Sequence, residues 1–329
     1  MRQVPKYLII GNGRVARHLA HYFSLLKIKT VSQWDRSQPL ARLLELATGS
    51  THILLAIKDD AIEPFVDEHL TNIAVCEHVQ ALSAAQAALE AGVTPGSMKA
   101  MAEAIAFFNK DHDKPLGRKH ISQLAKVVET LPKTGNAGLR KLAEKMDTLK
   151  KGLRKNIKIH FSGSLVTRKA YGAHPLMTFG PELYTLEKYL AIPFVVDEKA
   201  PLFSELLPGL HNPNVRLSEK NKAKYHALCV MAGNFSCILW QKLFTGLGGE
   251  LGIPPHTADM YLRQQTENLL TNYQGALTGP LARGDEATIA RNIRALDGDP
   301  FRKIYEAFVE AYPLTKQQQP NKARERKIL

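Results

Sequence analysis

Residues 1–60 alternate between short apolar runs and segments whose apolar residues recur at helical spacing. Runs of this length, bounded by Gly or polar residues, predict strands buried in a parallel sheet. The segments between them, 14–26 and 41–47, carry one apolar stripe each and predict helices. This strand–helix–strand–helix–strand order predicts the dinucleotide-binding half of a doubly wound sheet. The apolar runs lie at 7–10, 29–34 and 51–57.

The pattern changes between residues 76 and 155, a segment rich in Ala, Lys and Leu with helical periodicity and stops at Gly and Pro. It predicts about four helices. A crossover between parallel strands needs only about a dozen residues, so we expect a helical insertion that leaves the sheet intact. Strand patterns return at 157–161, 193–196 and 214–217.

From residue 219 onward the pattern is helical. Residues 222–243 are apolar almost all round and predict a buried central helix. The predicted fold is therefore an α/β Rossmann doubly wound sheet with a helical insertion over 1–218. An all-α domain for substrate binding and dimerisation follows over 219–329, with a disordered tail from about residue 315. Further helices are predicted at 256–272, 286–296 and 300–311.

Composition is that of a folded globular protein, with 44% hydrophobic and 23% charged residues in 329. The three cysteines form no C-x-x-C pair, which argues against a disulfide framework or a zinc site and favours a reducing compartment. The sequence contains no run of about 18 apolar residues, so it predicts no membrane span. The N-terminus lacks the pattern of a signal peptide. We therefore expect a cytoplasmic protein that does not enter a membrane.

The net charge of +13 admits an anionic cofactor or substrate, or nucleic acid. Much of the excess lies in two places, the segment 140–155 and the C-terminal tail. Because basic runs are usually solvated surfaces, we do not expect nucleic-acid binding.

The segment after the first strand has the form G-x-G-x-x-A and leads into a helix. Gly11 permits a tight turn, Gly13 lets the backbone approach a pyrophosphate, and the helix N-terminus faces the phosphate charge. The alternative is a strand–helix turn without a ligand. The residues predicted to hold a dinucleotide here are Gly11, Asn12, Gly13, Arg14 and Val15.

The end of the second strand carries Asp35, Arg36 and Ser37, about 20 residues past the loop. An acid at this place accepts from a ribose 2′-hydroxyl and selects NAD. Arg36 and Ser37 instead suit a 2′-phosphate. We expect NADP, with NAD possible. Exposed turn residues are the alternative.

Two further turns fall at the same edge of the predicted sheet. The turn after the third strand, Ala56, Ile57 and Lys58, is expected beside the nicotinamide ribose, although helix capping alone explains the acids that follow it. The turn after the strand at 157–161 contains Ser162 and Gly163, at the edge where ligands bind.

Five polar residues are candidates for the chemistry itself: His174, His226, Asn234, Thr278 and Arg283. His174 precedes Pro175 and is held extended, although a lone His is more often structural. His226 and Asn234 are about 80° apart around one helix, so both can border a cleft. Arg283 suits a substrate carboxylate, or it pairs with Asp285 in a helix-breaking loop.

Five motifs in order resemble the Rossmann-like proteins joined to the domain of unknown function 2520, over about 5–70 and 156–312. The motifs are 11–16, 160–165, 172–179, 225–227 with 234–235, and 276–285. This family of NADP-dependent oxidoreductases belongs to the 6-phosphogluconate dehydrogenase-like group. The resemblance implies a Rossmann domain, a helical domain often used for dimerisation, and a cofactor cleft.

One departure concerns the proton donor. Relatives that act on hydroxy acids carry a Lys one helical turn before an Asn, and here that position is Val230. His226, His174 or a bound water would have to replace it. The expected function is hydride transfer from NADPH to a small carbonyl or imine compound that bears a carboxylate, by a homodimer. The alternative is an NADP-binding module without catalysis.

Overall fold

The structure is a computed structural model that describes residues 4–70 and 156–317. The chain divides into two compact units, Met1–Phe235 and Ser236–Leu329. The predicted insertion at 76–155 lies outside the described residues, as does most of the predicted tail. Helix α15 runs to Gln317, so the chain is still helical where the sequence predicts the tail to begin.

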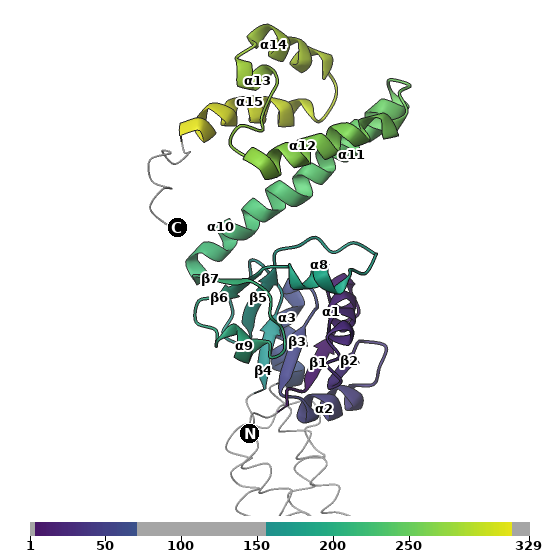
Figure 1. Ribbon diagram of the computed structural model, residues 1–329, viewed down its shortest axis with the longest axis vertical. Helices are drawn as coiled ribbons and strands as arrows, with labels where there is room; N and C mark the ends of the chain where they lie inside the picture. Colours follow the sequence, from purple (N-terminus) through teal and green to yellow (C-terminus); the bar gives the residue numbers. More distant parts are fainter. Residues whose placement is uncertain (1–3, 71–155, 318–329) are drawn as a thin grey trace, which may run out of the picture. The chain divides into compact units, whose positions relative to one another are not determined.

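The first unit is built on one seven-stranded sheet in the order β2-β1-β3-β4-β5-β6-β7 (Figure 1). All pairs are parallel except β5 with β6. The predicted Rossmann-like fold is therefore confirmed. The strands are β1 (Tyr7–Ile10), β2 (Val31–Trp34), β3 (His52–Leu55), β4 (Ile157–His160), β5 (Tyr171–Pro175), β6 (Phe194–Asp197) and β7 (Asn214–Leu217).

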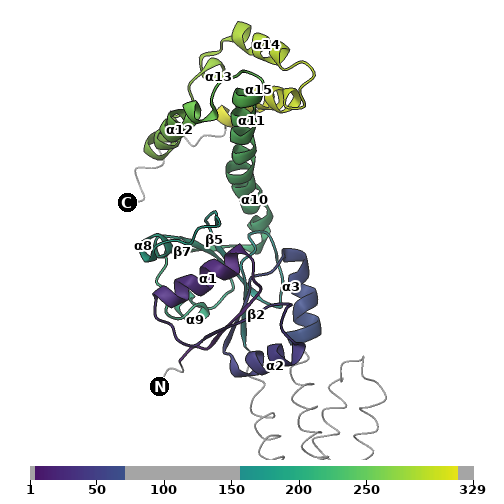
Figure 2. The ribbon, with the colours of Figure 1, turned by 90° about the vertical axis from the view of Figure 1, so that its right-hand side faces the viewer.

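Helices cover both faces of this sheet, with α1 on one side and α3 on the other (Figure 2). Successive side chains of a strand point to opposite faces, so Tyr7 and Ile9 pack in one core and Leu8 and Ile10 in the other. The helices of this unit before the long helix are α1 (Arg14–Leu25), α2 (Leu40–Gly49), α3 (Asp59–Phe65), the π-helical turn η1 (Val66–Leu70), α8 (Leu186–Leu190) and α9 (Phe203–Leu206).

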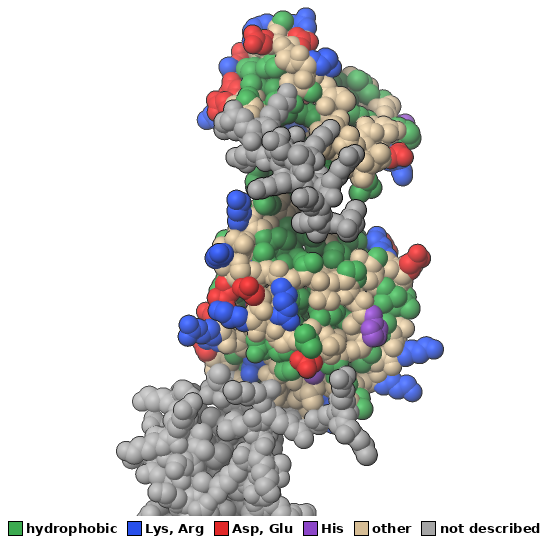
Figure 3. Space-filling view, turned by 60° about the vertical axis from the view of Figure 1, so that its left-hand side comes forward, with side chains coloured by type: hydrophobic (Ala, Val, Ile, Leu, Met, Phe, Trp, Pro, Cys, Tyr) green, Lys and Arg blue, Asp and Glu red, His purple; other side chains and the backbone are tan. Residues whose placement is uncertain are grey.

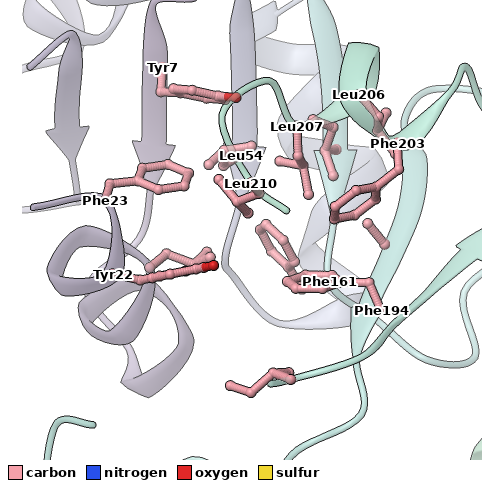
Figure 4. Close-up of a cluster of buried hydrophobic side chains, with 14 of the residues drawn as sticks. Tyr7, Tyr22, Phe23, Leu54, Phe161, Phe194, Phe203, Leu206, Leu207 and Leu210 are labelled. Carbon is pink, nitrogen blue, oxygen red and sulfur yellow. The ribbon is translucent and has the colours of Figure 1, made fainter. Parts of the chain in front are cut away.

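The larger core joins segments that are far apart in the chain (Figure 4). Tyr22 and Phe23 from α1 meet Phe194 from β6 and Leu206 from α9 in this cluster. Buried Asn212 fixes the same region, because its amide donates to the carbonyl of Tyr189 at 2.7 Å and its oxygen accepts from the Tyr22 hydroxyl at 2.8 Å. These contacts hold α1 and the dinucleotide loop before it on the sheet.

Strand β4 pairs directly with β3, with His52 opposite Ile157. The segment between η1 and β4 therefore leaves the sheet continuous, as predicted. Strand β5 was not predicted, because Gly172 and Pro175 give it weak strand propensity. Its partners β4 and β6 decide its conformation.

A long helix begins after β7 and comprises α10 (Glu219–Val230), the π-helical turn η2 (Met231–Phe235) and α11 (Ser236–Gly249). The sequence places the domain boundary at 218/219, before this helix. In the structure the first unit extends through Phe235, because Lys222 and Tyr225 of α10 bond to residues of the sheet.

The second unit is entirely helical among its described residues. The predicted helices at 256–272, 286–296 and 300–311 are all present, with small shifts in their bounds. Trp240 packs its ring edge against Tyr261 at a centroid distance of 5.4 Å, which joins α11 to α12. The elements are α11, η3 (Pro255–Ala258), α12 (Asp259–Asn272), α13 (Pro280–Arg283), α14 (Glu286–Ala295) and α15 (Arg302–Gln317).

The prediction that residues 222–243 form a buried helix is wrong for the single chain. Leu228 and Met231 are each 56% exposed, and Phe235, Ile238 and Leu239 are exposed as well. Among the described residues, one helix, 219–249, has the length and composition of a membrane span. Lys222, near the start of this helix, donates to Asp197 at the end of β6.

The basic segment 140–155 lies outside the described residues. On the described surface in Figure 3, Lys and Arg side chains stand apart among hydrophobic and polar groups. That face offers no continuous basic patch of the kind nucleic acid prefers.

Candidate functional site

A pocket of about 660 Å³ opens where β1, β2 and β3 end. Strand β1 lies between β2 and β3, so chain order reverses beside it, and ligands of doubly wound sheets bind at such a point. The pocket brings together three predicted segments and adds a wall from α3 and η1. Its lining is Ile10, Gly11, Asn12, Gly13, Trp34, Asp35, Arg36, Ser37, Ala56, Ile57, Lys58, Ala61, Pro64, Phe65, Glu68 and His69.

Gly11 has a conformation that only glycine adopts easily, with φ at +116°, and a Cβ there would overlap the carbonyl oxygen of Ala56. Its amide donates to the Trp34 carbonyl at 2.8 Å, which closes the turn against β2. Gly13 differs, because no atom lies within 4 Å of where its Cβ would be. The space beside Gly13 is open for a ligand.

Asp35 and Arg36 at the end of β2 differ in how far they are available to a ligand. The Asp35 carboxylate accepts from the Ser37 amide at 2.9 Å and from the Ser37 hydroxyl at 2.6 Å. The Ser37 hydroxyl bond, followed by the amide bond, lowers the pKa of Asp35. Arg36 is exposed at the pocket wall. The cation is thus available to a ligand, while the acid already has two donors.

Four residues predicted to bind the cofactor do not line this pocket: Arg14, Val15, Ser162 and Gly163. Arg14 and Val15 begin α1, and Val15 packs on the core instead. Ser162 donates to the carboxylate of Asp59, the residue after pocket-lining Lys58. This bond joins the pocket edge to a second group of polar side chains.

The second group lies around Gly163. The predicted candidates His174 and His226 meet here, with ring centroids 6.0 Å apart and rings nearly perpendicular. A Cβ on Gly163 would lie 2.5 Å from Cδ2 of His226 and 3.2 Å from Nε2 of His174, so the backbone lies directly against both rings. His174 Nδ1 shares a hydrogen bond of 2.8 Å with the Tyr225 hydroxyl.

Beneath these rings lies a buried charged pair that the sequence analysis missed. The Lys222 ammonium donates to Asp197 Oδ1 at 2.6 Å, and Asp197 Oδ2 accepts from the Gly172 amide at 2.5 Å. His160 is fully buried at the end of β4. Among the described residues, neither ring nitrogen of His160 has a hydrogen-bond partner.

Burial keeps both inner histidines uncharged at neutral pH. It lowers the pKa of His160 to about 4, and the nearby Lys222 charge adds to the decrease. It also lowers the pKa of His174 to about 4, with further decreases from His226 and Lys222 and an opposing effect of Asp59. Burial, together with Cys229, raises the pKa of the Tyr225 phenol. The side chains of His160, His174 and Tyr225 are therefore neutral and lie beside the charged pair of Lys222 and Asp197.

The other three predicted residues lie elsewhere. Asn234 is exposed in η2. Thr278 and Arg283 are exposed in the second unit, where Asp285 caps α14 by accepting from the Thr288 amide at 3.0 Å. The structure thus brings His174 and His226 together in the first unit, whereas Thr278 and Arg283 belong to the second unit.

Asp59, His160, Asp197, Lys222 and Tyr225 are members of the group that sequence reasoning did not select. A signal existed for Lys222, because a charged residue four positions before His226 shares its helix face. None existed for Asp197, whose position depends on pairing between β5 and β6.

Comparison with known sequences identifies the C-terminal part of the chain. Residues 192–312 match the family described as Domain of unknown function (DUF2520). The resemblance inferred from the motifs is confirmed over this range, which begins just before β6 and includes Asp197, Lys222 and His226. No match was found among curated proteins.

The fold is similar to that of the putative NADP oxidoreductase BF3122 from Bacteroides fragilis. The TM-score is 0.54 at 15% identity, over 93% of this chain and 97% of that one. Protein TM1727 from Thermotoga maritima gives 0.48 at 16% identity, over 95% and 100% of the two chains. An NADH-preferring ketol-acid reductoisomerase from an uncultured archaeon gives 0.43 at 9% identity, over 95% and 84%. The first likeness establishes a shared fold.

The described residues fit a nicotinamide dinucleotide. The pyrophosphate would lie at Gly11–Gly13, where the amides of the first turn of α1 are free to donate and space beside Gly13 is open. Arg36 would reach a 2′-phosphate, and Trp34 and Phe65, with centroids 5.9 Å apart, would flank the adenine end. Lys58 would lie toward the nicotinamide ribose, next to the hydrogen bond that Ser162 donates to Asp59.

The uncharged state of His160 predicts a pH dependence of stability. Its pKa falls from 6.5 to about 4 on folding, so the folded chain binds fewer protons than the unfolded chain between these values. The free energy of unfolding therefore falls as pH decreases through this window, by roughly 3 kcal/mol for this ring. We expect His160→Leu to remove that part of the slope and to be at least as stable as the native chain at pH 7.

Urea denaturation at several pH values between 4.5 and 7 measures this. His211→Leu, which replaces an exposed histidine of the same unit, is the matched control and should retain the native slope. Equal slopes for the native chain and His160→Leu would contradict the assignment.

Proposed function

We propose that this protein is an NADP-dependent oxidoreductase that reduces a small carbonyl or imine compound bearing a carboxylate, in the cytoplasm. The observation that carries the proposal is the continuity of two sites. Lys58 lines the dinucleotide-type pocket, and the next residue, Asp59, accepts a hydrogen bond from Ser162, whose neighbour Gly163 lies against the rings of His174 and His226. A cofactor in that pocket would direct its nicotinamide end toward His174 and His226, whose rings both lie against Gly163.

The bound cofactor would supply the hydride. His174 and His226 are both half-buried, and we assign the proton transfer to His226 because Nδ1 of His174 already shares a hydrogen bond with the Tyr225 hydroxyl. Histidine suits this role because its charge changes near neutral pH. Asn234, about two helical turns after His226 on the same long helix, would orient the substrate.

NADP is favoured over NAD by the arrangement after β2. Arg36 is exposed to the pocket, whereas the Asp35 carboxylate is held by Ser37. A ribose 2′-hydroxyl would have to compete with Ser37 for that acid. A 2′-phosphate would pair with Arg36.

Cofactor binding is tested by titration with NADPH and NADH, followed by fluorescence. We expect NADPH to bind below the millimolar range and more tightly than NADH. Gly13→Asp should weaken NADPH binding by about 100-fold or more, because a carboxylate would face the pyrophosphate. Gly13→Ala should fold like the native chain, since its Cβ meets nothing.

Absence of binding of either nucleotide would reject the proposal. Preference for NADH would reject the role given to Arg36. Tight NADPH binding without turnover of any keto or imino acid would support the alternative, a module that binds NADP without catalysis, which the absence of a lysine at position 230 also favours.

The role of His226 is tested in steady-state turnover of NADPH with the best keto or imino acid found by screening. We expect His226→Gln to lower kcat by about 10²- to 10⁴-fold, the usual contribution of a general acid. Its dissociation constant for NADPH should stay within about twofold, because the ring lies outside the cofactor pocket. His211→Gln is the control. A kcat near the native value would show that another group donates the proton.

We also propose that the protein is a homodimer, with the apolar face of α10 and α11 as its interface. The support is the row of exposed apolar side chains along this helix, since large exposed apolar patches are unusual on monomers. Light scattering should give twice 36.6 kDa. Leu228→Glu should shift the mass toward the monomer, whereas Leu202→Glu, at an exposed site of the sheet unit, should not. A native chain at monomer mass would reject the dimer.

A further inference from the structure

Helix α10 packs against the sheet with the opposite polarity to that of most surface helices. An amphipathic helix ordinarily buries its apolar face. Here Lys222 is only 4% exposed and Tyr225 and His226 are half-buried, while Leu228 is 56% exposed. The face of α10 that meets the carboxyl ends of the strands is therefore its polar face.

The Lys222 ammonium has room at its position because Gly172 has no side chain. His160 of β4 lies opposite Gly172 of β5, and the Gly172 amide donates to Asp197 at the end of β6. A Cβ on Gly172 would lie 2.6 Å from Lys222 Nζ. The ammonium thus occupies the gap over Gly172, between His160 and Asp197.

Stability alone does not account for this group. A buried ion pair can often be replaced by apolar side chains at no cost or with a gain. A buried ring with neither nitrogen bonded, as in His160, also destabilises relative to an apolar ring of similar size. Polar groups retained against their stability cost are characteristic of functional sites.

We propose that Lys222 is a positioning residue of this site: its ammonium, held over Gly172 by Asp197, supplies the fixed positive charge that acts on the reaction through His174. The proposal rests on the proposed function. Lys222 would thus be a cation in the first turns of α10. It lies two helical turns before Val230, the position at which relatives that act on hydroxy acids carry their lysine. Lys222 itself is too buried to touch a substrate.

The groups around His174 determine the sign of the effect. His226 and Tyr225 face it from α10, Asp59 from α3 and His160 from β4. Gly172 and His174 are two residues apart on β5 and so share one face of the strand, the face on which the Lys222 ammonium lies over Gly172. From there the Lys222 charge opposes protonation of His174, and the Asp59 charge favours it. With Lys222 present, His174 stays an uncharged partner for the Tyr225 hydroxyl across the neutral range. Without it, His174 takes up a proton at higher pH.

The test is an NMR titration of the His174 ring in the full-length protein labelled on histidine, with His174→Gln to assign the signal. In the native chain we expect His174 to remain unprotonated down to at least pH 5. In Lys222→Met/Asp197→Asn, which leaves no lone buried charge, its midpoint should rise above the native value. Lys224→Met, on the exposed face of the same helix, should leave the His174 midpoint unchanged. Lys222→Arg, which keeps a positive charge at this position, should keep the midpoint close to its native value.

Two results would overturn the proposal: an ordinary midpoint near 6.5 in the native chain, or an unchanged midpoint in the folded double variant. If a substrate is found, the acidic limb of the pH dependence of kcat should move to higher pH in the double variant, together with the His174 midpoint. A limb that stays in place while only the melting temperature changes would show a structural role. If no NADPH turnover is found at all, the proposed function fails, while the NMR midpoint still decides the role of Lys222.

Discussion

The parallel pairing of β1, β3 and β4 is the constraint on which the rest of the molecule depends. These strands are covered on both faces, and parallel strands bring their carboxyl ends to one edge. The loops after them therefore meet whatever the length of chain between them. For β3 and β4 that length includes the whole segment 71–155, yet Lys58–Asp59 and Ser162–Gly163 are neighbours.

Strands β5 and β6 add a second layer to this edge. The first residues of β5 pair with the last residues of β4. Strand β5 and its partner β6 therefore extend the sheet past the carboxyl ends of the central strands. His174 and Asp197 lie on this extension, and α10 covers it with Lys222, Tyr225 and His226. The dinucleotide-type pocket belongs to the first three strands, whereas the titratable group belongs to β4, β5, β6 and α10.

The two sites differ in how their residues relate to stability. In the pocket, Gly11 serves the turn, because its lack of a Cβ avoids the Ala56 carbonyl, and Gly13 leaves open space for a ligand. In the titratable group, the Lys222–Asp197 pair and the His160 ring, which has no hydrogen-bond partner in the described part of the chain, carry a desolvation cost. The apolar core of Tyr22, Phe194 and their neighbours offsets this cost.

The sequence by itself determined the first three strands, the dinucleotide loop, the residues after β2 and the helical C-terminal half, because these depend on local periodicity and on glycine positions. It also selected His174 and His226. Only the tertiary structure decided that β5 is a strand, that Gly172 leaves a gap, and that Lys222 and Asp197 meet in it beside His160. The physical reason is that those positions follow from strand register and from the face on which α10 packs. Local pattern carries no information about either, and the apolar character of 222–243 pointed to a buried helix where the structure buries its polar face.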